Sequence, residues 1–219
     1  MAAAALAATK SRSVLVLGAT GLVGAECVRQ LMRDDSCTRV VALTRRAHDA
    51  FMSSPKLEVH TVNFDELDQQ SELFEVDQVI CALGTTARKT PSRELYRKID
   101  YEYPLTVARL AKERGASHYL VVTALGANAT SSIFYNRLKG EVEDSLALLD
   151  YRSLTIARPS VLIGDRAESR LSERMAWKLG FITPRKYKPV PASRVAAALI
   201  TAARDDLPGL RIIENAEMI

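Results

Sequence analysis

The stretch Val14-Leu15-Val16-Leu17-Gly18-Ala19-Thr20-Gly21-Leu22-Val23-Gly24 decides the fold of this 219-residue chain. Its first four residues form a continuous apolar run, the pattern of a strand that is buried on both faces. The residues from Leu22 to Met32 follow with helical periodicity. A buried strand, a glycine-rich turn and a helix, in this order and near the N-terminus, are typical of the first unit of a dinucleotide-binding sheet.

The three glycines of this turn each have a physical task. Gly18 permits a tight turn at the strand end, Gly21 lets the backbone approach a pyrophosphate, and Gly24 permits close packing of helix on strand. The helix that follows offers unpaired backbone N–H groups and the positive end of its dipole to phosphate oxygens. We therefore expect the turn to bind a pyrophosphate; the alternative is a purely structural turn, since glycines mark turns in many proteins.

The rest of the chain alternates apolar runs of strand length with stretches of helical periodicity. This alternation predicts an α/β fold, a Rossmann-type doubly wound parallel sheet with right-handed crossovers, in a single domain. We expect residues 1–12 to be a flexible leader and residues 13–219 to be the nucleotide-binding domain, with small C-terminal elements on the substrate side. The predicted strands are Val14–Leu17, Val40–Leu43, Leu57–Val62, Val79–Leu83, Tyr119–Val122, Ser153–Ala157 and Leu210–Ile213. The predicted helices are Leu22–Met32, a long helix from Pro91 to Gly115, Ile133–Leu149, Leu171–Leu179 and Ser193–Ala203.

The composition is that of an ordinary globular chain, 47% hydrophobic and 26% charged, with a formal net charge of +4. The cations are interleaved with acids, as in Lys112-Glu113-Arg114, so the basic balance and the Arg88-Lys89 pair do not predict nucleic-acid binding. No stretch approaches eighteen consecutive apolar residues, and the alanine-rich start lacks a basic region, so we expect no membrane span and no signal peptide. We expect a cytoplasmic protein, a monomer or a homodimer.

The cysteines and histidines do not predict a metal site. Cys27, Cys37 and Cys81 show no CxxC spacing, and the three histidines lack the spacing of metal ligands. Cys27 and Cys81 fall inside a predicted helix and a predicted strand, so we expect both to be buried thiols of a reducing compartment.

The end of the second predicted strand indicates which dinucleotide is bound. An NAD site usually offers an acidic residue there to hold the ribose hydroxyls, whereas this chain has Thr44-Arg45-Arg46 and no acid before Asp49. A carboxylate would repel a 2′-phosphate, and guanidinium groups bind one through charge-assisted hydrogen bonds. Arg45 and Arg46 therefore favour NADP(H) over NAD(H).

A tyrosine and a lysine stand four residues apart in the helix predicted over Ile133–Leu149. Tyr135 and Lys139 lie on one face of that helix, close to its apolar stripe, so we expect both to face inward. A free tyrosine has a pKa of about 10, and a nearby lysine cation would lower the pKa toward the range in which a phenol exchanges protons at neutral pH. The pair is a candidate for acid–base catalysis in the crevice at the carboxyl ends of the strands.

A hydroxyl that could assist the tyrosine lies at the end of the fifth predicted strand. Thr123 follows Val122, where its side chain could point into the same crevice and hydrogen-bond a substrate carbonyl. Ser131 and Ser132, in the loop that follows, are rival hydroxyls. Threonine is also a common strand former, so this position alone does not decide between them.

Three motifs of the chain occur in one order: GATGLVG at residues 18–24, YNRLK at residues 135–139 with Thr123 upstream, and ARPSVLIGDR at residues 157–166. Together they resemble the short-chain dehydrogenase/reductase superfamily. The segments CALGTTARK, YNRLKGEVE and RPSVLIGDRAESR are similar to its atypical single-domain branch, typified by the Tat-interacting-protein-like oxidoreductases. The resemblance extends over essentially the whole chain from Ser13 onward.

The resemblance implies a cofactor role for each matching residue. It implies that the pyrophosphate is held by Gly18, Thr20, Gly21, Leu22 and Gly24. It implies that the 2′-phosphate is bound by Arg45 and Arg46, and adenine by Asn63 and Phe64, although the superfamily often has Asp where Asn63 stands. The remaining cofactor contacts would be made on the ribose side by Leu83 and Gly84, and on the nicotinamide side by Pro159 and Val161.

The resemblance also implies a reaction. Tyr135 would be the general acid or base, and Lys139 would lower its pKa and hold the nicotinamide ribose. The superfamily often has paired serines where this chain has Thr123-Ala124, and the large C-terminal substrate domain of the extended enzymes is missing. We expect an NADP(H)-dependent oxidoreductase that acts on a small carbonyl or alcohol; the alternative is a non-enzymatic NADP(H)-binding regulator that works through a protein partner.

Overall fold

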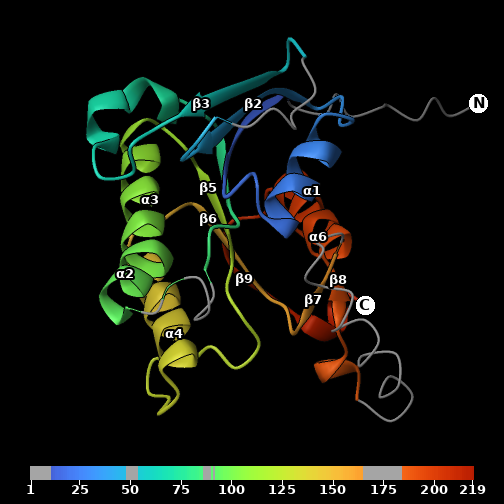
Figure 1. Cartoon of the computed structure of the whole chain (residues 1–219). Coiled ribbons are helices and arrows are strands. Elements are labelled where there is room, and N and C mark those ends of the chain that lie inside the picture. The colour runs from blue at the N-terminus through green and yellow to red at the C-terminus, as the bar shows by residue number, and fades with distance from the viewer. Residues whose placement is uncertain (1–10, 48–53, 86–89, 91, 165–183) are drawn as a thin grey trace, which may run out of the picture.

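The computed structural model describes residues 11–47, 54–85, 90, 92–164 and 184–219 (Figure 1). Its centre is a sheet of seven parallel strands in the order β3-β2-β1-β4-β5-β6-β9. The order reverses between β1 and β4, so the crevice at their carboxyl ends is the topological switch point of a doubly wound sheet. The strands are β1 Arg12–Leu17, β2 Cys37–Thr44, β3 Leu57–Thr61, β4 Gln78–Cys81, β5 His118–Val122, β6 Ser153–Arg158 and β9 Gly209–Glu214.

Helices cover both faces of the sheet (Figure 1). On one face lie α1 (Leu22–Leu31) and α6 (Ala192–Asp205), whose buried side chains join the core cluster of Val14, Val16 and their neighbours. On the other face lie the 3-10 helical segment η1 (Leu67–Phe74), α3 (Tyr103–Glu113) and α4 (Phe134–Ala147). The shorter elements are α2 Arg93–Arg97, η2 Lys98–Glu102, η3 Arg185–Tyr187, η4 Asn215–Glu217 and the paired strands β7 Leu162–Ile163 and β8 Val190–Pro191.

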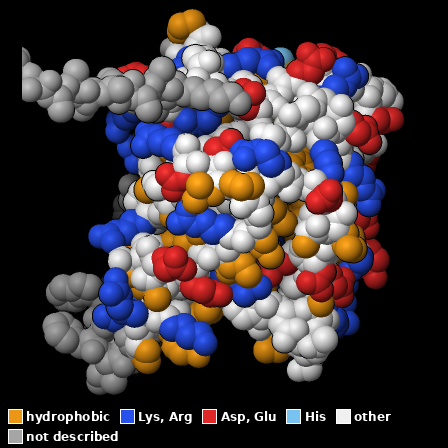
Figure 2. All heavy atoms as spheres, turned by 180° about the vertical axis from the view of Figure 1, so that it is seen from behind, with side chains coloured by type: hydrophobic (Ala, Val, Ile, Leu, Met, Phe, Trp, Pro, Cys, Tyr) orange, Lys and Arg blue, Asp and Glu red, His pale blue; other side chains and the backbone are white. Residues whose placement is uncertain are grey.

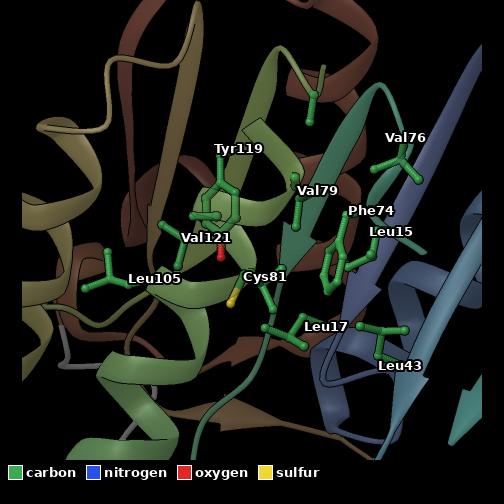
Figure 3. Packing of buried hydrophobic residues seen from close by; sticks show 14 of the residues in the cluster. Leu15, Leu17, Leu43, Phe74, Val76, Val79, Cys81, Leu105, Tyr119 and Val121 are labelled. Atoms are coloured by element: carbon green, nitrogen blue, oxygen red, sulfur yellow. The ribbon is translucent and has the colours of Figure 1, made fainter. Parts of the chain in front are cut away.

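The central strands are buried on both faces, as their continuous apolar runs predict. In β1, Val14 and Val16 point to the core cluster on the α1 side, while Leu15 and Leu17 point to the cluster on the α3 side. Figure 3 shows Leu15, Val79 and Cys81 beside one another in this second cluster, with the ring of Tyr119 next to them. The buried Tyr119 hydroxyl donates to the Pro104 carbonyl at 2.9 Å, which satisfies its polar atom inside the core.

The long helix predicted up to Gly115 is present, with one departure. Helical structure runs from Arg93 to Glu113, but a turn of π-helix, Lys98–Glu102, interrupts the α-helical pattern between α2 and α3. Gly115 has φ +99°, the left-handed conformation of a residue just past a helix end, as its sequence position predicts. Pro91, residues 1–10 of the predicted leader and the helix predicted over Leu171–Leu179 lie outside the described residues. Arg12, predicted to belong to the leader, instead begins β1 and is buried, because it pairs with the buried Asp34.

The other elements agree with the sequence predictions to within a few residues. The predicted α/β class, the parallel sheet and the single domain are confirmed. The 3-10 segment η1 and the small β7-β8 pair were not predicted, because neither has enough length to establish a periodicity.

Cys27, Cys37 and Cys81 are all buried free thiols. Basic and acidic side chains are interleaved on the face shown in Figure 2.

A buried carboxylate joins three segments at the end of the sheet opposite the crevice. Asp34, which is 4% exposed, pairs with the buried Arg12 of β1 and with Nε of Arg204 on α6 at 2.9 Å. Ser36 donates to the other carboxylate oxygen through its backbone N–H and its hydroxyl. Burial opposes the charged form, but the hydrogen bonds from Arg204 and Ser36 and the charge of Arg12 hold the pKa of Asp34 well below its usual value.

Asp34→Asn is expected to lower the free energy of unfolding at pH 7 by about 3 kcal/mol, because it leaves the buried Arg12 without its counter-charge. The pKa of Asp34 is lower in the folded chain than the unfolded value of about 3.9. Its contribution is therefore complete above about pH 4 and is lost as the pH falls below that value. Urea unfolding at several pH values measures both effects. Asp35→Asn, at the exposed neighbouring residue, is the control, and an equal loss in both variants would contradict the assignment.

Candidate functional site

The glycine turn sits at the switch point, pressed against the end of β4. Gly18 has φ +81°, and a Cβ built on it would lie 2.6 Å from the Ala82 carbonyl oxygen. The N–H of Gly21 donates to the Gly18 carbonyl at 2.8 Å, which closes the turn. Both the tight turn and the close approach of the neighbouring strand therefore require glycine at position 18.

The third glycine sets how closely α1 packs on the turn. A Cβ on Gly24 would lie 2.1 Å from the Gly18 carbonyl oxygen, so no side chain fits there. A Cβ on Gly21 would lie 3.0 Å from the same oxygen, a contact that a small shift can relieve. The predicted packing roles of Gly18 and Gly24 are confirmed, and the role of Gly21 toward a pyrophosphate stays a prediction.

The start of α1 is open to a ligand. Gly21 occupies the N-cap position and has no side chain to bond the first N–H groups of α1. A hollow of about 450 Å³ adjoins them and is lined by residues of the turn, of α1 and of the segments around β7 and β8. Thr20, Gly21 and Leu22 are among these residues, together with Ile163, Gly164 and Ser193. Three of the predicted pyrophosphate ligands thus border one hollow.

The two arginines predicted to select the cofactor follow the end of β2. β2 ends at Thr44, whose side chain is buried, and both Arg45 and Arg46 are exposed. Neither has an ion pair with another of the described residues. Two guanidinium groups beside the end of β2 can reach a phosphate at the crevice edge.

The residues predicted to contact adenine divide into an exposed and a buried one. Asn63 is exposed and its side chain accepts the backbone N–H of Asp65 at 3.1 Å. Phe64 is 6% exposed and packs on Tyr103, with ring centroids 5.2 Å apart. The Phe64 ring therefore belongs to the core, because the chain turns inward after β3. Of these two side chains, only that of Asn63 lies on the surface.

The tyrosine and lysine of α4 lie at the carboxyl end of β4, beside the turn. Lys139 is 5% exposed, and its Nζ is 2.8 Å from Oδ2 of the buried Asp100 and 6.0 Å from the centroid of the Tyr135 ring. A Cβ on Gly84, three residues after β4, would lie 3.4 Å from Asp100 Oδ2 and 3.8 Å from Lys139 Nζ. The Tyr-Lys pair and the glycine turn therefore flank the same short segment, Ala82 to Gly84.

The inward orientation predicted for this pair is right for Lys139 and holds only in part for Tyr135. Tyr135 is 38% exposed, because it lies in the first turn of α4, which begins at Phe134 beyond the end of the sheet. Its phenol is nevertheless close enough to Lys139 and Asp100 for both charges to act on it, and Lys139, one turn further on, lies beneath it.

Electrostatics around the pair differ from the prediction. Burial raises the pKa of Tyr135 and Lys139 lowers it, but Asp100 raises it again, and the net pKa lies above the ordinary value. For Lys139, burial opposes the charge, while the neighbouring Asp100 holds the pKa above its usual value. Lys139 is therefore a stable cation, and the expected lowering of the Tyr135 pKa does not occur in the protein without cofactor.

Asp100 is the site residue that the sequence analysis missed. It lies in the π-helical turn and is 1% exposed, and its Oδ1 accepts the backbone N–H of Thr85 at 2.8 Å. A single turn of π-helix within an α-helix often marks a functional site. The signal in the sequence was weak, because one acid in a polar stretch of helix usually faces solvent.

Thr123 occupies a different environment from the one predicted. Its side chain is 4% exposed and donates to Oε1 of the buried Glu143 at 2.6 Å. Arg158 of β6 bonds both oxygens of Glu143 and pairs with Glu214 of β9. The Thr123 hydroxyl therefore belongs to a buried network that joins β5, β6, β9 and α4. Among the rival hydroxyls, Ser132 is exposed, and Ser131 accepts the N–H of Ile133 at 3.2 Å.

The remaining predicted cofactor contacts lie around the crevice. Leu83 is partly buried against the core, and Gly84 is exposed beside Lys139. Pro159 is buried, and its carbonyl accepts the N–H of Leu125 at 2.8 Å, while Val161 is 59% exposed.

Among the described residues, no group of three His, Cys, Asp or Glu side chains is arranged to hold a metal ion. Within the same residues, no helix has both the length and the apolar character needed to cross a membrane.

Comparison with known proteins identifies the family of the chain. A family model described as NAD(P)H-binding matches residues 18–206. "Protein FMP52, mitochondrial" of Candida albicans is 35% identical over 208 residues, which cover 90% of this chain and 90% of that protein. "Protein HTATIP2" of Rattus norvegicus is 33% identical over 205 residues, which cover 92% of this chain and 82% of that protein.

Solved structures share the fold at low sequence identity. The Bordetella bronchiseptica enzyme WbmG in complex with NAD has a TM-score of 0.73 at 13% identity, over 97% of this chain and 75% of that one. MoeE5 in complex with UDP-glucose and NAD has a TM-score of 0.70 at 16% identity, over 92% of this chain and 76% of that one. These likenesses concern the architecture alone.

Gly24→Ala is expected to lower the free energy of unfolding by about 1–3 kcal/mol, because the new methyl group must displace α1 from the Gly18 carbonyl. The variant is also expected to lose affinity for a dinucleotide, since the same shift moves the N-terminus of α1. Thermal unfolding and fluorescence titration with NADPH measure the two effects. Gly21→Ala, where the built contact is 3.0 Å, is the matched variant and should fold nearly as well as the wild type. Equal stability of all three proteins would contradict this account of Gly24.

Proposed function

The chain belongs to the NAD(P)H-binding family that includes FMP52 and HTATIP2, and from that membership we propose that it is an NADP(H)-dependent oxidoreductase. One observation carries the proposal beyond binding. A buried lysine, paired with an acid, lies beneath an accessible tyrosine at the strand end that adjoins the glycine turn. A pure dinucleotide-binding domain has no need of this arrangement, since burying a charged pair costs free energy that the fold must recover elsewhere.

The residues of the crevice fit a dinucleotide phosphate. The uncapped start of α1 and the side-chain-free turn at Gly18 suit a pyrophosphate. Arg45 and Arg46, both exposed and without an ion pair among the described residues, would bind the 2′-phosphate and so favour NADP(H) over NAD(H). Asn63 would contribute to the adenine side, and Gly84, Pro159 and Val161 would border the ribose and nicotinamide.

The reaction we propose is hydride transfer to or from a small carbonyl or alcohol substrate. When bound, the reduced nicotinamide supplies the hydride. Tyr135 exchanges the proton with the substrate oxygen, because its ring is partly exposed and lies 6.0 Å from Lys139 Nζ. Lys139 is held beneath it by Asp100 and presents a fixed positive charge to the ribose and to the phenol.

A second candidate function is a non-enzymatic NADP(H)-binding regulator. It is favoured by the position of Thr123, whose hydroxyl donates to Glu143 inside a buried network. If no second hydroxyl assists Tyr135, the crevice is better suited to binding than to turnover. Such a regulator would bind the cofactor with similar affinity but would show no NADPH consumption.

The location in the cell is a separate question from the chemistry. The fungal relative FMP52 is named a mitochondrial protein, and we propose a mitochondrial location as the alternative to the cytoplasmic one expected from the sequence. Imaging of the C-terminally tagged chain against a mitochondrial marker distinguishes the two.

Tyr135→Phe is expected to abolish NADPH-dependent reduction, because phenylalanine keeps the ring and removes the proton. The Kd for NADPH should stay within about twofold, since one phenol contributes little to the binding of a whole dinucleotide. Absorbance at the NADPH band across a panel of aldehydes, ketones and quinones measures turnover, and fluorescence titration measures Kd. Tyr187→Phe, at another exposed tyrosine, is the control. Full activity in Tyr135→Phe would show that another group is the acid.

Arg45→Ala/Arg46→Ala is expected to raise the Kd for NADPH by about tenfold to a hundredfold, because the two exposed arginines together are expected to contribute about 1.5–3 kcal/mol to binding one phosphate. The Kd for NADH should not change, since NADH has no 2′-phosphate. Arg33→Ala/Arg109→Ala removes two other exposed arginines and serves as the control for the loss of net charge. Equal weakening of NADPH and NADH would contradict the selection of the 2′-phosphate.

A further inference from the structure

The ion pair between Asp100 and Lys139 places a negative and a positive charge close to the phenol of Tyr135. Asp100 Oδ2 is 2.8 Å from Lys139 Nζ, and the two side chains are 1% and 6% exposed. Solvent therefore screens neither charge. At Tyr135 the two charges act in opposite directions, because Lys139 lowers the pKa of the phenol and Asp100 raises it.

The surroundings hold Asp100 in this position. The π-helical turn at Lys98–Glu102 carries Asp100 into the core, and the N–H of Thr85 fixes Oδ1 at 2.8 Å, which leaves Oδ2 toward the lysine. The hydroxyl of Tyr96 in turn donates to the Thr85 carbonyl at 3.0 Å. The position is thus defined by α2, by the π-helical turn and by the segment after β4.

We propose that Asp100 is a positioning residue that offsets the charge of Lys139 and so holds Tyr135 as the proton donor that the reduction of a carbonyl compound requires. This rests on the oxidoreductase function proposed above and adds a residue to its site. In that reduction the carbonyl carbon accepts a hydride and is reduced by two electrons, while NADPH is oxidised to NADP⁺. The substrate oxygen takes the proton of the Tyr135 hydroxyl, and the phenolate then regains a proton from water.

The other groups that face the pair support this balance of charge. Among the described residues, Tyr135 is faced by Lys139 from α4, by Asp100 from the π-helical turn and by Tyr96 from α2. Cys81 of β4 lies near Lys139, and burial raises the pKa of this thiol, which keeps it neutral. Tyr96 is neutral for the same reason. The charged groups at the phenol are thus Lys139 and Asp100 alone among the residues described.

The test is the ionisation of Tyr135 in the protein without cofactor, followed by NMR of tyrosine labelled with ¹³C at Cζ, with Tyr135→Phe used to assign the resonance. In the wild type, we expect the pKa of Tyr135 to lie above that of a free tyrosine. In Asp100→Asn, Lys139 acts unopposed, and we expect the pKa of Tyr135 to fall by about one unit or more. The control is Glu141→Gln, which removes an acid of α4 that pairs with Arg97. It should leave the titration of Tyr135 unchanged.

An unchanged Tyr135 titration in folded Asp100→Asn would overturn the proposal, because a merely structural aspartate would alter stability without moving this signal. If Asp100→Asn does not fold, the double variant Asp100→Asn/Lys139→Gln tests the same balance without a lone buried charge. If the two charges offset one another, the pKa of Tyr135 in this double variant should lie within about half a unit of the wild-type pKa. A rise of the Tyr135 pKa by about one unit or more would contradict the proposal.

The same experiment separates this inference from the proposed function. The NMR titration needs neither substrate nor cofactor, so a fall of the Tyr135 pKa in Asp100→Asn supports the role of Asp100 even where the carbonyl panel shows no turnover. Turnover in the panel with an unmoved titration supports the oxidoreductase and overturns the role of Asp100.

Discussion

The absence of side chains at Gly18 and Gly24 is the constraint on which the rest of the crevice depends. A methyl group at Gly24 would overlap the Gly18 carbonyl, and one at Gly18 would overlap the Ala82 carbonyl. Three backbone segments, the turn, the first turn of α1 and the end of β4, therefore meet at van der Waals distance. This contact brings the uncapped N-terminus of α1 beside the segment from Ala82 to Gly84, and so defines one wall of the site.

The other wall of the site contains two buried carboxylates, each of which is paired with a cation. Asp100 pairs with Lys139, and Glu143, one turn further along α4, accepts hydrogen bonds from Arg158 and Thr123. Each acid has its own cation, which is the condition under which a charge is tolerated in a protein interior. The separation of the two pairs has a chemical consequence. The Thr123 hydroxyl is used in the hydrogen bond to Glu143, and the phenol of Tyr135 is the partly exposed group beside Lys139.

Binding and turnover rest on different parts of this arrangement. The glycine turn is a feature of a dinucleotide site whatever its chemistry, and the arginines after β2 bear only on which dinucleotide we propose is bound. The phenol above a lysine paired with an acid is the feature that favours a reaction. The family shares the fold with NAD-bound enzymes of low sequence identity, so the fold alone does not decide between an enzyme and a regulator.

The sequence by itself determined the fold and the glycine turn. Strand and helix periods, and the glycine spacing at 18, 21 and 24, are local patterns, and each follows from the geometry of a single element. The tertiary structure decided the rest. Asp100 reaches Lys139 only because a π-helical turn from one helix packs against another, Tyr135 is exposed because the sheet ends below it, and Thr123 turns to Glu143 because an acid from α4 lies within reach. A hydrogen bond between residues 20 positions apart and an ion pair between residues 39 positions apart leave no period in the sequence, so no local pattern could have revealed these partners.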